Sequence, residues 1–328
     1  MGPRTDTILL RLLNDRTLFS DDDMNYFFKR ALDDKNMKII RLLYLNGFDI
    51  HDANLDNGKS AVHYLAKVDE PGDRYKVNNE VTLKMMKFFL SNAYKIHCDV
   101  LGYTYLHAAC MVGDVTTVRW FAIRGVNANL KVYKHSPLHI AAQYRNEDIV
   151  KALLKSGANP NLRDHERSTA LHALTWVRLC RCVRRDNFCS RRKPVDGIVE
   201  ALVERGADIE ARNNHGDTPL QLAVSRFDVE LTRSLLGRGA STQNLNEDRM
   251  FSGEFEPYEL KNYPVTLNII EVVQLLKSAG YDMSLRVRLR MLKLWMKVRG
   301  KDADHWLADY SGKYTPFGFP RVIICNCY

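Results

Sequence analysis

Short apolar runs, each followed by a glycine, recur along the chain. In the segment Glu147–Leu154 the apolar residues are spaced as on one face of an α-helix, and Gly157 follows shortly after. Glycine readily adopts the left-handed conformation that ends many helices. The same arrangement predicts helices that end near Gly47, Gly125, Gly157, Gly206, Gly239 and Gly280, and near Asn92, which stands at the glycine position of one further run.

A four-residue motif recurs with the same period. It begins with Ser or Thr and usually ends with His. Its five copies end at His63, His107, His139, His172 and Gln221, so the spacings are 44, 32, 33 and 49 residues. Ser or Thr can cap a helix N-terminus, and the Pro that follows in two copies fits the first helical turn. Each period therefore predicts a helix that begins at the motif and a second that ends at the glycine. The two long intervals predict inserts, near residues 68–80 and 178–193.

These motifs, TPLH-like and followed by a helix–helix–Gly unit at a period of 33, resemble the ankyrin repeat over roughly residues 22–283. The resemblance implies an all-α solenoid of about seven helix-turn-helix units. Residues 1–21 form an N-terminal lead-in, and residues 284–328 a C-terminal capping helix and tail. In the first unit, residues 25–50, only the second helix is recognisable. The last unit, residues 248–282, lacks the motif, and terminal repeats are commonly atypical.

The histidines that end four copies of the motif are candidates for chemistry. In the ankyrin resemblance this imidazole bonds the motif hydroxyl and neighbouring backbone, which is a structural role. Gln221 at the same position supports this role, because an amide keeps a hydrogen bond but cannot do acid–base chemistry. The sequence also has no Gly-rich phosphate loop, HExxH or GxSxG motif. We therefore expect no enzyme, no catalytic residue, no cofactor and no metal.

Charge is concentrated in two segments. The chain has 48 Lys and Arg against 39 Asp and Glu, a net charge of +9. Residues 178–193 hold seven basic residues against Asp186, and residues 286–301 hold seven and no acid. The remainder is slightly acidic, so we do not expect the continuous positive face that tracks nucleic acid. Binding of a polyanion or a membrane surface through the two basic segments remains an alternative function.

The first basic segment also contains three cysteines, Cys180, Cys182 and Cys189. Their spacing lacks the paired CxxC of zinc sites, so we expect a solvated loop instead. Its basic pairs, such as Arg184-Arg185, also resemble a nuclear-import signal.

The second basic segment predicts an amphipathic helix. Its basic residues form one stripe, Arg286, Arg290, Lys293 and Lys297, and its apolar residues another, Leu285, Leu289, Leu292 and Met296. We expect the apolar stripe to cover the open end of the solenoid. A membrane surface or an acidic partner is the alternative contact for this helix.

The uncharged stretches of the chain are short. The longest stretch without Asp, Glu, Lys or Arg, Val100–Gly113, is too short to cross a bilayer, and the N-terminus lacks the apolar core of a secretory signal. We expect a monomer in the cytoplasm, with the nucleus as the alternative compartment. Its seven cysteines are expected to be free thiols.

The predicted function is non-catalytic binding of a protein partner, as a scaffold, adaptor or inhibitor. Residues that follow the motif on each first helix should line the concave side, and turn residues before the motif should extend that surface. Tyr144 and Trp176 are expected to lie side by side there as aromatic anchors. The candidate partner-binding residues are Tyr103, Met111, Lys134, His135, Gln143, Tyr144, Arg167, Trp176, Asn214, His215, Ser225 and Arg226.

The irregular, insert-bearing repeats are similar to those of ankyrin proteins from poxviruses and some parasitoid insects. Many of those proteins carry a C-terminal F-box-like segment that recruits a ubiquitin ligase. The resemblance therefore implies a second alternative, a substrate-recruiting subunit of a ubiquitin ligase. A clear Leu-Pro opening of an F-box is absent from this sequence.

Overall fold

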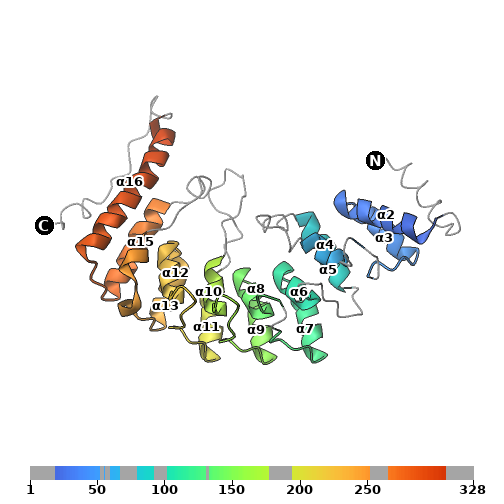
Figure 1. The fold of residues 1–328 in the computed structure, drawn as a ribbon, viewed down its shortest axis with the longest axis horizontal. Helices are drawn as coiled ribbons and strands as arrows, with labels where there is room; N and C mark the ends of the chain where they lie inside the picture. Colours follow the sequence, from blue (N-terminus) through green and yellow to red (C-terminus); the bar gives the residue numbers. More distant parts are fainter. Residues whose placement is uncertain are drawn as a thin grey trace.

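The chain forms a curved row of helix pairs (Figure 1). The computed structural model describes residues 19–51, 55, 60–66, 80–91, 102–130, 133–176, 194–251 and 265–307, with the side chains of the last helix described as far as Met296. The predicted insert 178–193, the predicted insert near 68–80 except Glu80, and the part of the expected C-terminal tail from residue 308 lie outside these residues. None of the described helices combines the length and apolar character needed to span a bilayer.

Six helix pairs follow one another along the described part of the chain. They are α2 (Asp21–Asp33) with α3 (Met37–Leu45), α4 (Ala61–Ala66) with α5 (Glu80–Ser91), α6 (Tyr105–Val112) with α7 (Val115–Ile123), α8 (Pro137–Gln143) with α9 (Glu147–Lys155), α10 (Ala170–Ala173) and the 3-10 turn η4 (Leu174–Trp176) with α11 (Asp196–Glu204), and α12 (Pro219–Ser225) with α13 (Val229–Gly237). The C-terminal part holds the 3-10 turns η5 (Thr242–Asn244) and η6 (Glu247–Arg249), then α15 (Val265–Ser278) and α16 (Leu285–Leu307).

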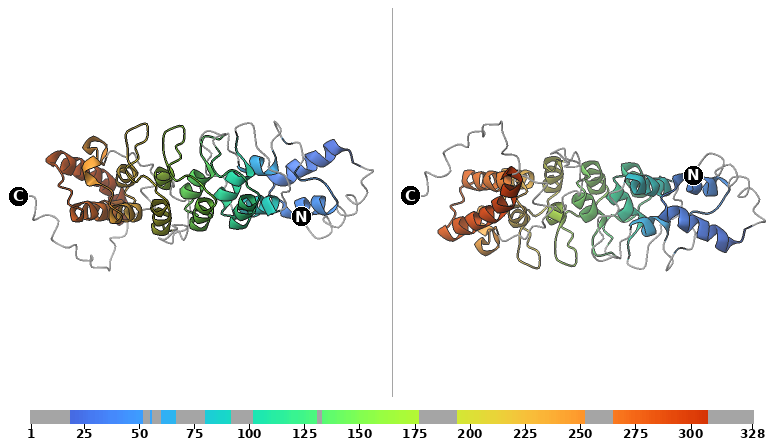
Figure 2. Two further views of the ribbon diagram at one scale, coloured as in Figure 1. Left: turned by 90° about the horizontal axis from the view of Figure 1, so that it is seen from below. Right: turned by 90° about the horizontal axis from the view of Figure 1, so that it is seen from above.

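The helices stack in two rows. First helices contact first helices, as α6 contacts α8 and α8 contacts α10, while α7, α9, α11 and α13 contact one another in turn. Figure 2 shows the two rows along the array, with turns between successive units projecting from it. This arrangement confirms the predicted all-α solenoid.

Local sequence explains where the helices begin. Ser136 and Thr218 accept hydrogen bonds from backbone N–H groups in the first turns of α8 and α12, and each precedes a proline at the first helical position. Two of the second helices, α7 and α13, begin at aspartate caps: Asp114 accepts from Thr117 N and Asp228 from Leu231 N, both at 3.2 Å. These aspartates are a second helix-start signal, additional to the four-residue motif.

Glycines end the second helices, as predicted. After α9, Gly157 has a φ of +86°, and Ala158 N donates to Leu153 O at 3.0 Å, which closes the helix end. Positive φ angles occur at the matching glycines Gly47, Gly125, Gly206, Gly239 and Gly280.

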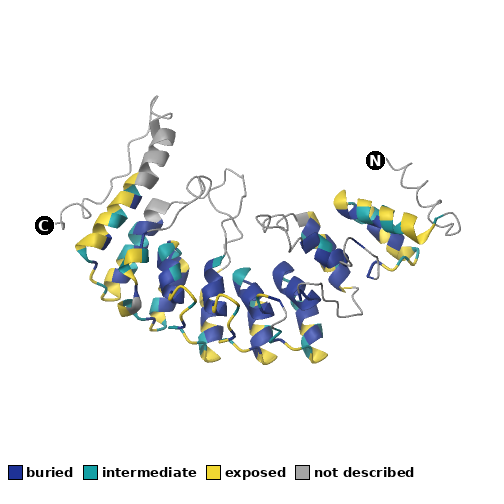
Figure 3. Cartoon of the chain, in the orientation of Figure 1, coloured by how far each residue is buried: buried dark blue, intermediate teal, exposed yellow. Residues whose placement is uncertain are grey.

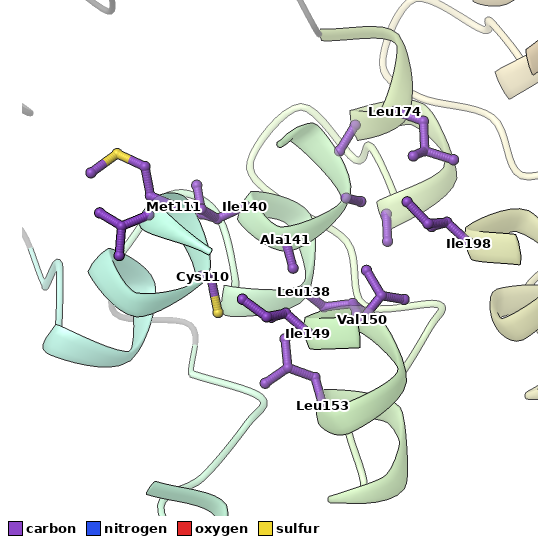
Figure 4. Packing of buried hydrophobic residues seen from close by; sticks show 14 of the residues in the cluster. Cys110, Met111, Leu138, Ile140, Ala141, Ile149, Val150, Leu153, Leu174 and Ile198 are labelled. Carbon is purple, nitrogen blue, oxygen red and sulfur yellow. The ribbon is translucent and has the colours of Figure 1, made fainter. Parts of the chain in front are cut away.

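The core lies between the rows and runs through the array (Figure 3). Figure 4 shows Leu138 and Ala141 of α8 facing Ile149, Val150 and Leu153 of α9, and all five are at most 2% exposed. Each unit thus buries apolar side chains against its own partner helix and against the neighbouring units.

The first unit is more complete than the sequence analysis expected. It contains a helix pair, because α2 precedes α3, and α2 begins at Asp21, the last residue of the expected lead-in. Ser20 caps this helix through a reciprocal pair of bonds with Asp23. Its face of Phe28, Ala31 and Leu32 is buried. The prediction failed because this helix starts without the four-residue motif.

The last helix covers the end of the array with a different face from the one expected. Val287 and Leu294 are buried where α16 packs on α15, and Met291 is partly buried beside them. The predicted capping stripe is instead exposed: Leu285, Leu289, Leu292 and Met296. The helix is apolar on two roughly opposite faces, so the sequence pattern did not determine which one would pack.

Candidate partner-binding surface

The motif histidines form a buried ladder that ties each unit to the next. In His107, Nδ1 accepts from Thr104 N at 3.1 Å and lies 2.8 Å from the Thr104 hydroxyl, so Nε2–H donates to His135 O at 3.0 Å. His63, His139 and His172 make the equivalent bonds to the next unit's backbone, at Tyr103 O, Ser168 O and Asp217 O. The ladder confirms the predicted structural role of these imidazoles.

The glutamine copy of the motif keeps the same connection. Gln221 Oε1 accepts from Asn246 N at 2.6 Å, and its Nε2 donates to Asn246 O at 3.4 Å. An amide therefore links α12 to the following turn as an imidazole does elsewhere.

Burial favours the neutral form of three of the ladder histidines, His107, His139 and His172. It lowers the pKa of His107 to about 3 and that of His139 to about 4, and it also lowers the pKa of His172. These three imidazoles are therefore neutral near pH 7 and act as hydrogen-bonding groups of the scaffold, which leaves recognition to exposed side chains.

The turn before α10 is held by one carboxylate. Asp164 Oδ1 accepts from Glu166 N at 2.9 Å and Ser168 N at 2.7 Å, and its Oδ2 lies 3.1 Å from His135 Nδ1 of the preceding turn. Desolvation opposes the charge of Asp164, but hydrogen bonds from His135 and Ser168 outweigh it and lower the pKa of this carboxyl. Arg167 is exposed at the tip, in the left-handed region with φ of 56°.

The next turn is bonded to the tip of this one. Asn214 N donates to Glu166 O at 2.9 Å, and its side-chain amide donates to His165 O at 3.2 Å. Asn214 and His215 are themselves exposed. Three successive turns therefore present their side chains in fixed positions relative to one another.

Aromatic rings lie where these turns meet the first helices. The Trp176 ring is 4.8 Å from the His135 ring and 6.2 Å from the His139 ring, centroid to centroid, the latter nearly parallel at 14°. Trp176 remains partly exposed. The exposed residue Arg226, from the following unit, donates to Thr175 O at 3.0 Å beside it.

Most of the predicted binding residues reach the surface. Lys134 is exposed like Arg167, Asn214, His215 and Arg226, whereas partial exposure is found for His135, Gln143, Tyr144, Trp176 and Ser225.

Two of the predicted residues are buried, and this corrects the expectation. Tyr103 is 2% exposed and its hydroxyl donates to Met111 Sδ at 3.6 Å, with Met111 itself 9% exposed. Tyr103 packs on the rings of His107 and Tyr133, so this turn residue belongs to the core.

The expected pairing of Tyr144 with Trp176 also needs correction. Trp176 stands four residues after its motif histidine and Tyr144 five, so Gln143 is the residue that matches Trp176. The rings that contact Trp176 are those of His135 and His139.

Arg145 was not among the predicted residues. This buried residue lies between α8 and α9 with a positive φ, the position that Gly113 takes in the preceding unit. Its guanidinium donates to Asp228, the cap of α13, and so bridges two units that are not adjacent in sequence. The signal available was an Arg at a glycine position.

One cluster among the described residues has donors spaced for a divalent cation. Ligand atoms of His135, Asp164 and His165 lie within 4.8 Å of one another. Both Asp164 oxygens already accept the hydrogen bonds that shape the turn. The cluster thus has a sufficient structural explanation.

Three basic residues in the described part of α16, Arg286, Arg288 and Arg290, are paired within the chain. Arg286 and Arg290 both reach Asp248, at 2.9 and 2.8 Å, and Arg288 reaches Asp282 at 3.3 Å. These ion pairs reduce the positive potential that a polyanion would meet. The other basic segment, residues 178–193, lies outside the described part of the chain.

Comparison with known proteins agrees with this architecture. Residues 75–164 match the family model for ankyrin repeats, in three copies. The chain is 32% identical to the B-cell lymphoma 3 protein homolog of Mus musculus over 142 residues, covering 43% of this chain and 28% of that protein. It is 33% identical to an ankyrin repeat protein of fowlpox virus over 114 residues, 34% of this chain and 22% of that protein.

A third relative is a far larger protein. The chain is 32% identical to the E3 ubiquitin-protein ligase KEG of Arabidopsis thaliana over 143 residues, 42% of this chain and 8% of that protein. In all three cases the similarity spans less than a third of the relative's length.

Proposed function

Because the chain is an ankyrin-repeat protein and such repeats are protein-interaction modules, we propose that it is a non-catalytic scaffold that binds a protein partner. The proposed binding surface lies on the central units of the array and is here called the tip surface. It comprises the turn tips of three successive units, together with Trp176 and Arg226 beside them: Lys134, His135, His165, Arg167, Trp176, Asn214, His215 and Arg226.

The observation that carries this proposal is the bonding between successive tips. Asn214 bonds both the backbone of Glu166 and that of His165, while Asp164 bonds His135 of the preceding turn. A surface held in this way loses little conformational entropy when a partner binds, and more of the contact energy is available as affinity.

The chemistry of the tip surface favours a partner with an apolar anchor and acidic neighbours. Trp176 offers a partly exposed ring face, and Trp is among the residues that most often dominate binding energy. Lys134, Arg167 and Arg226 add exposed positive charges on the same three units, with Arg226 bonded to Thr175 O beside the ring. An acidic partner would be steered by these charges and held by the ring.

The test compares charge reversals on two faces of the full-length chain. The double variant Lys134→Glu/Arg167→Glu changes two exposed tip residues of adjacent units. The matched control, Lys155→Glu/Arg205→Glu, makes the same charge change at exposed ends of α9 and α11 in the other row. We expect the tip variant to lose at least about tenfold in affinity for a partner captured by the wild-type chain, with the control unchanged.

Equal affinity of both variants would refute the tip surface as the binding site. Salt dependence separates the polyanion alternative from it. If the partner is a polyanion, affinity should fall by several orders of magnitude between low and physiological salt. This salt dependence should disappear when the charges of the basic segments are reversed, which would indicate counterion release.

Recruitment of substrates to a ubiquitin ligase is the second candidate. Its support is the similarity to KEG, whose name describes an E3 ubiquitin-protein ligase, over a small share of that protein. Co-purification of ligase subunits with the full-length chain, retained in the Lys134→Glu/Arg167→Glu variant, would place that contact away from the tip surface.

A further inference from the structure

A row of large apolar side chains is exposed along α16. Leu285, Leu289, Leu292 and Met296 are 73%, 51%, 46% and 67% exposed, and their spacing places them on one face of the helix, here called the outer stripe. Figure 3 shows α16 at the end of the array with exposed residues along it. Contiguous apolar surface of this kind marks a contact site on most soluble proteins.

The outer stripe is separate from the contact that caps the solenoid. The capping face of α16, with Val287 and Leu294, is already buried against the array. In the described part of the chain, Leu285 remains 73% exposed, and the other three members of the outer stripe are between 46% and 67% exposed. Burial of the outer stripe therefore requires a contact separate from the one with α15.

Charge modestly disfavours a second copy of the chain on this face. Arg286 and Lys293 lie along one side of the outer stripe and Arg288 along the other, all three exposed. Arg286 and Arg288 are ion-paired with Asp248 and Asp282, so the repulsion between two stripes packed face to face comes mainly from Lys293 and disfavours the pairing only modestly.

We propose that residues 308–328 of the same chain fold back and cover the outer stripe. This segment follows directly after Leu307 and is rich in apolar side chains, with Tyr310, Tyr314, Phe317, Phe319 and Val322-Ile323-Ile324. Its charged residues are few: Asp309, Lys313 and Arg321. The segment thus offers apolar surface and little added repulsion.

The length of the segment suits this path. At about 1.5 Å per residue, Leu307 lies roughly 33 Å along the helix axis from Leu285. Twenty-one residues reach up to about 70 Å when extended, so the segment can return along the whole stripe. Gly312, Pro316 and Pro320 favour an extended strap over a continued helix. The tether keeps the effective concentration in the millimolar range, well above that of a free partner.

The natural cysteines of the segment, Cys325 and Cys327, allow a direct test in the full-length chain. In a background where the three cysteines of the 178–193 insert are replaced by serine, Leu289→Cys is oxidised mildly and the disulfides are mapped by mass spectrometry. The matched control is Leu45→Cys, an equally apolar exposed position on α3 at the other end of the array. We expect an intramolecular disulfide from residue 289 to the segment, and at most a trace from residue 45.

Two other products would identify other occupants and overturn the proposal. A disulfide joining residue 289 of two chains, in a dimer by light scattering, would assign the stripe to a second copy. Flotation of the wild-type chain with phosphatidylserine-containing vesicles, lost in Leu289→Lys/Leu292→Lys, would assign it to a membrane surface.

Proteolysis supplies a second measurement. Trypsin cleavage after Lys313 and Arg321 should accelerate about tenfold in Leu289→Lys/Leu292→Lys, because the displaced segment becomes accessible. Leu45→Lys should leave both cleavage rates unchanged. Equal rates in wild type and the double variant would overturn the proposal even if the disulfide had formed.

Discussion

Replacing His139 by Gln should remove part of the acid sensitivity of the fold. His139 is 1% exposed, its Nδ1 lies 2.7 Å from the Ser136 hydroxyl, and its Nε2 bonds Ser168 O at 2.9 Å. Gln221 shows that an amide can make the equivalent link to the next unit. The substitution therefore keeps a hydrogen bond but removes a group that titrates.

The magnitude follows from the pKa difference between the folded and unfolded states. Burial lowers the pKa of His139 to about 4, against about 6.5 in an unfolded chain. As pH falls, the unfolded state takes up the proton first, so the contribution is complete above pH 6.5 and is lost as pH falls toward 4. At pH 5 the loss amounts to about 2 kcal/mol for this one histidine.

The measurement is urea unfolding followed by circular dichroism at pH 7.5 and pH 5. At pH 7.5 the variant should be less stable by about 1 kcal/mol, the value of an imperfectly replaced hydrogen bond. Between the two pH values it should lose about 2 kcal/mol less than wild type. The reverse change, Gln221→His, should add a similar loss. Identical pH dependence in wild type and His139→Gln would refute the claim that this imidazole is buried in its neutral form.

Three further predictions concern stability. Leu138→Ala should lower the free energy of unfolding by about 2–5 kcal/mol, because it opens a cavity between α8 and α9, and an unchanged melting temperature would contradict the assigned packing. Deleting residues 181–192 should leave the helical circular dichroism signal unchanged, because the segment lies in the interval that exceeds the repeat period. A loss of helical signal would contradict the assignment of this segment as an insert. Asp228→Ala should destabilise the array by about 3–5 kcal/mol in urea unfolding, because it leaves the buried Arg145 guanidinium without its main partner, whereas Asp228→Ala/Arg145→Gly should recover part of that loss.

The central units were predictable because several local signals agree there. The motif hydroxyl begins a helix, the glycine ends one, and the apolar spacing specifies the buried face, as at Ser136, Leu138 and Gly157. Each signal acts within a few residues. The first unit lacks the motif, so its first helix was missed although Ser20 and the buried Phe28 were present in the sequence.

The candidate site was predicted less completely, because exposure depends on neighbouring units. Tyr103 stands at a turn and was expected at the surface, yet the aromatic rings of the next turn bury it. The bonds from Asn214 to the tip of the preceding turn join residues nearly fifty positions apart, across the insert. No local pattern contains them.

The ends of the array differ from its centre for the same physical reason. A central helix has neighbours on both sides, so its apolar residues have only one arrangement that buries them. The last helix packs chiefly on one helix, α15, and has two apolar faces to offer it. Val287 and Leu294 pack there, while the ion pairs of Arg286 and Arg290 with Asp248 hold the helix in that rotation. The face left over is then available for a further contact, and it is at such ends that an otherwise regular scaffold can acquire a second interaction.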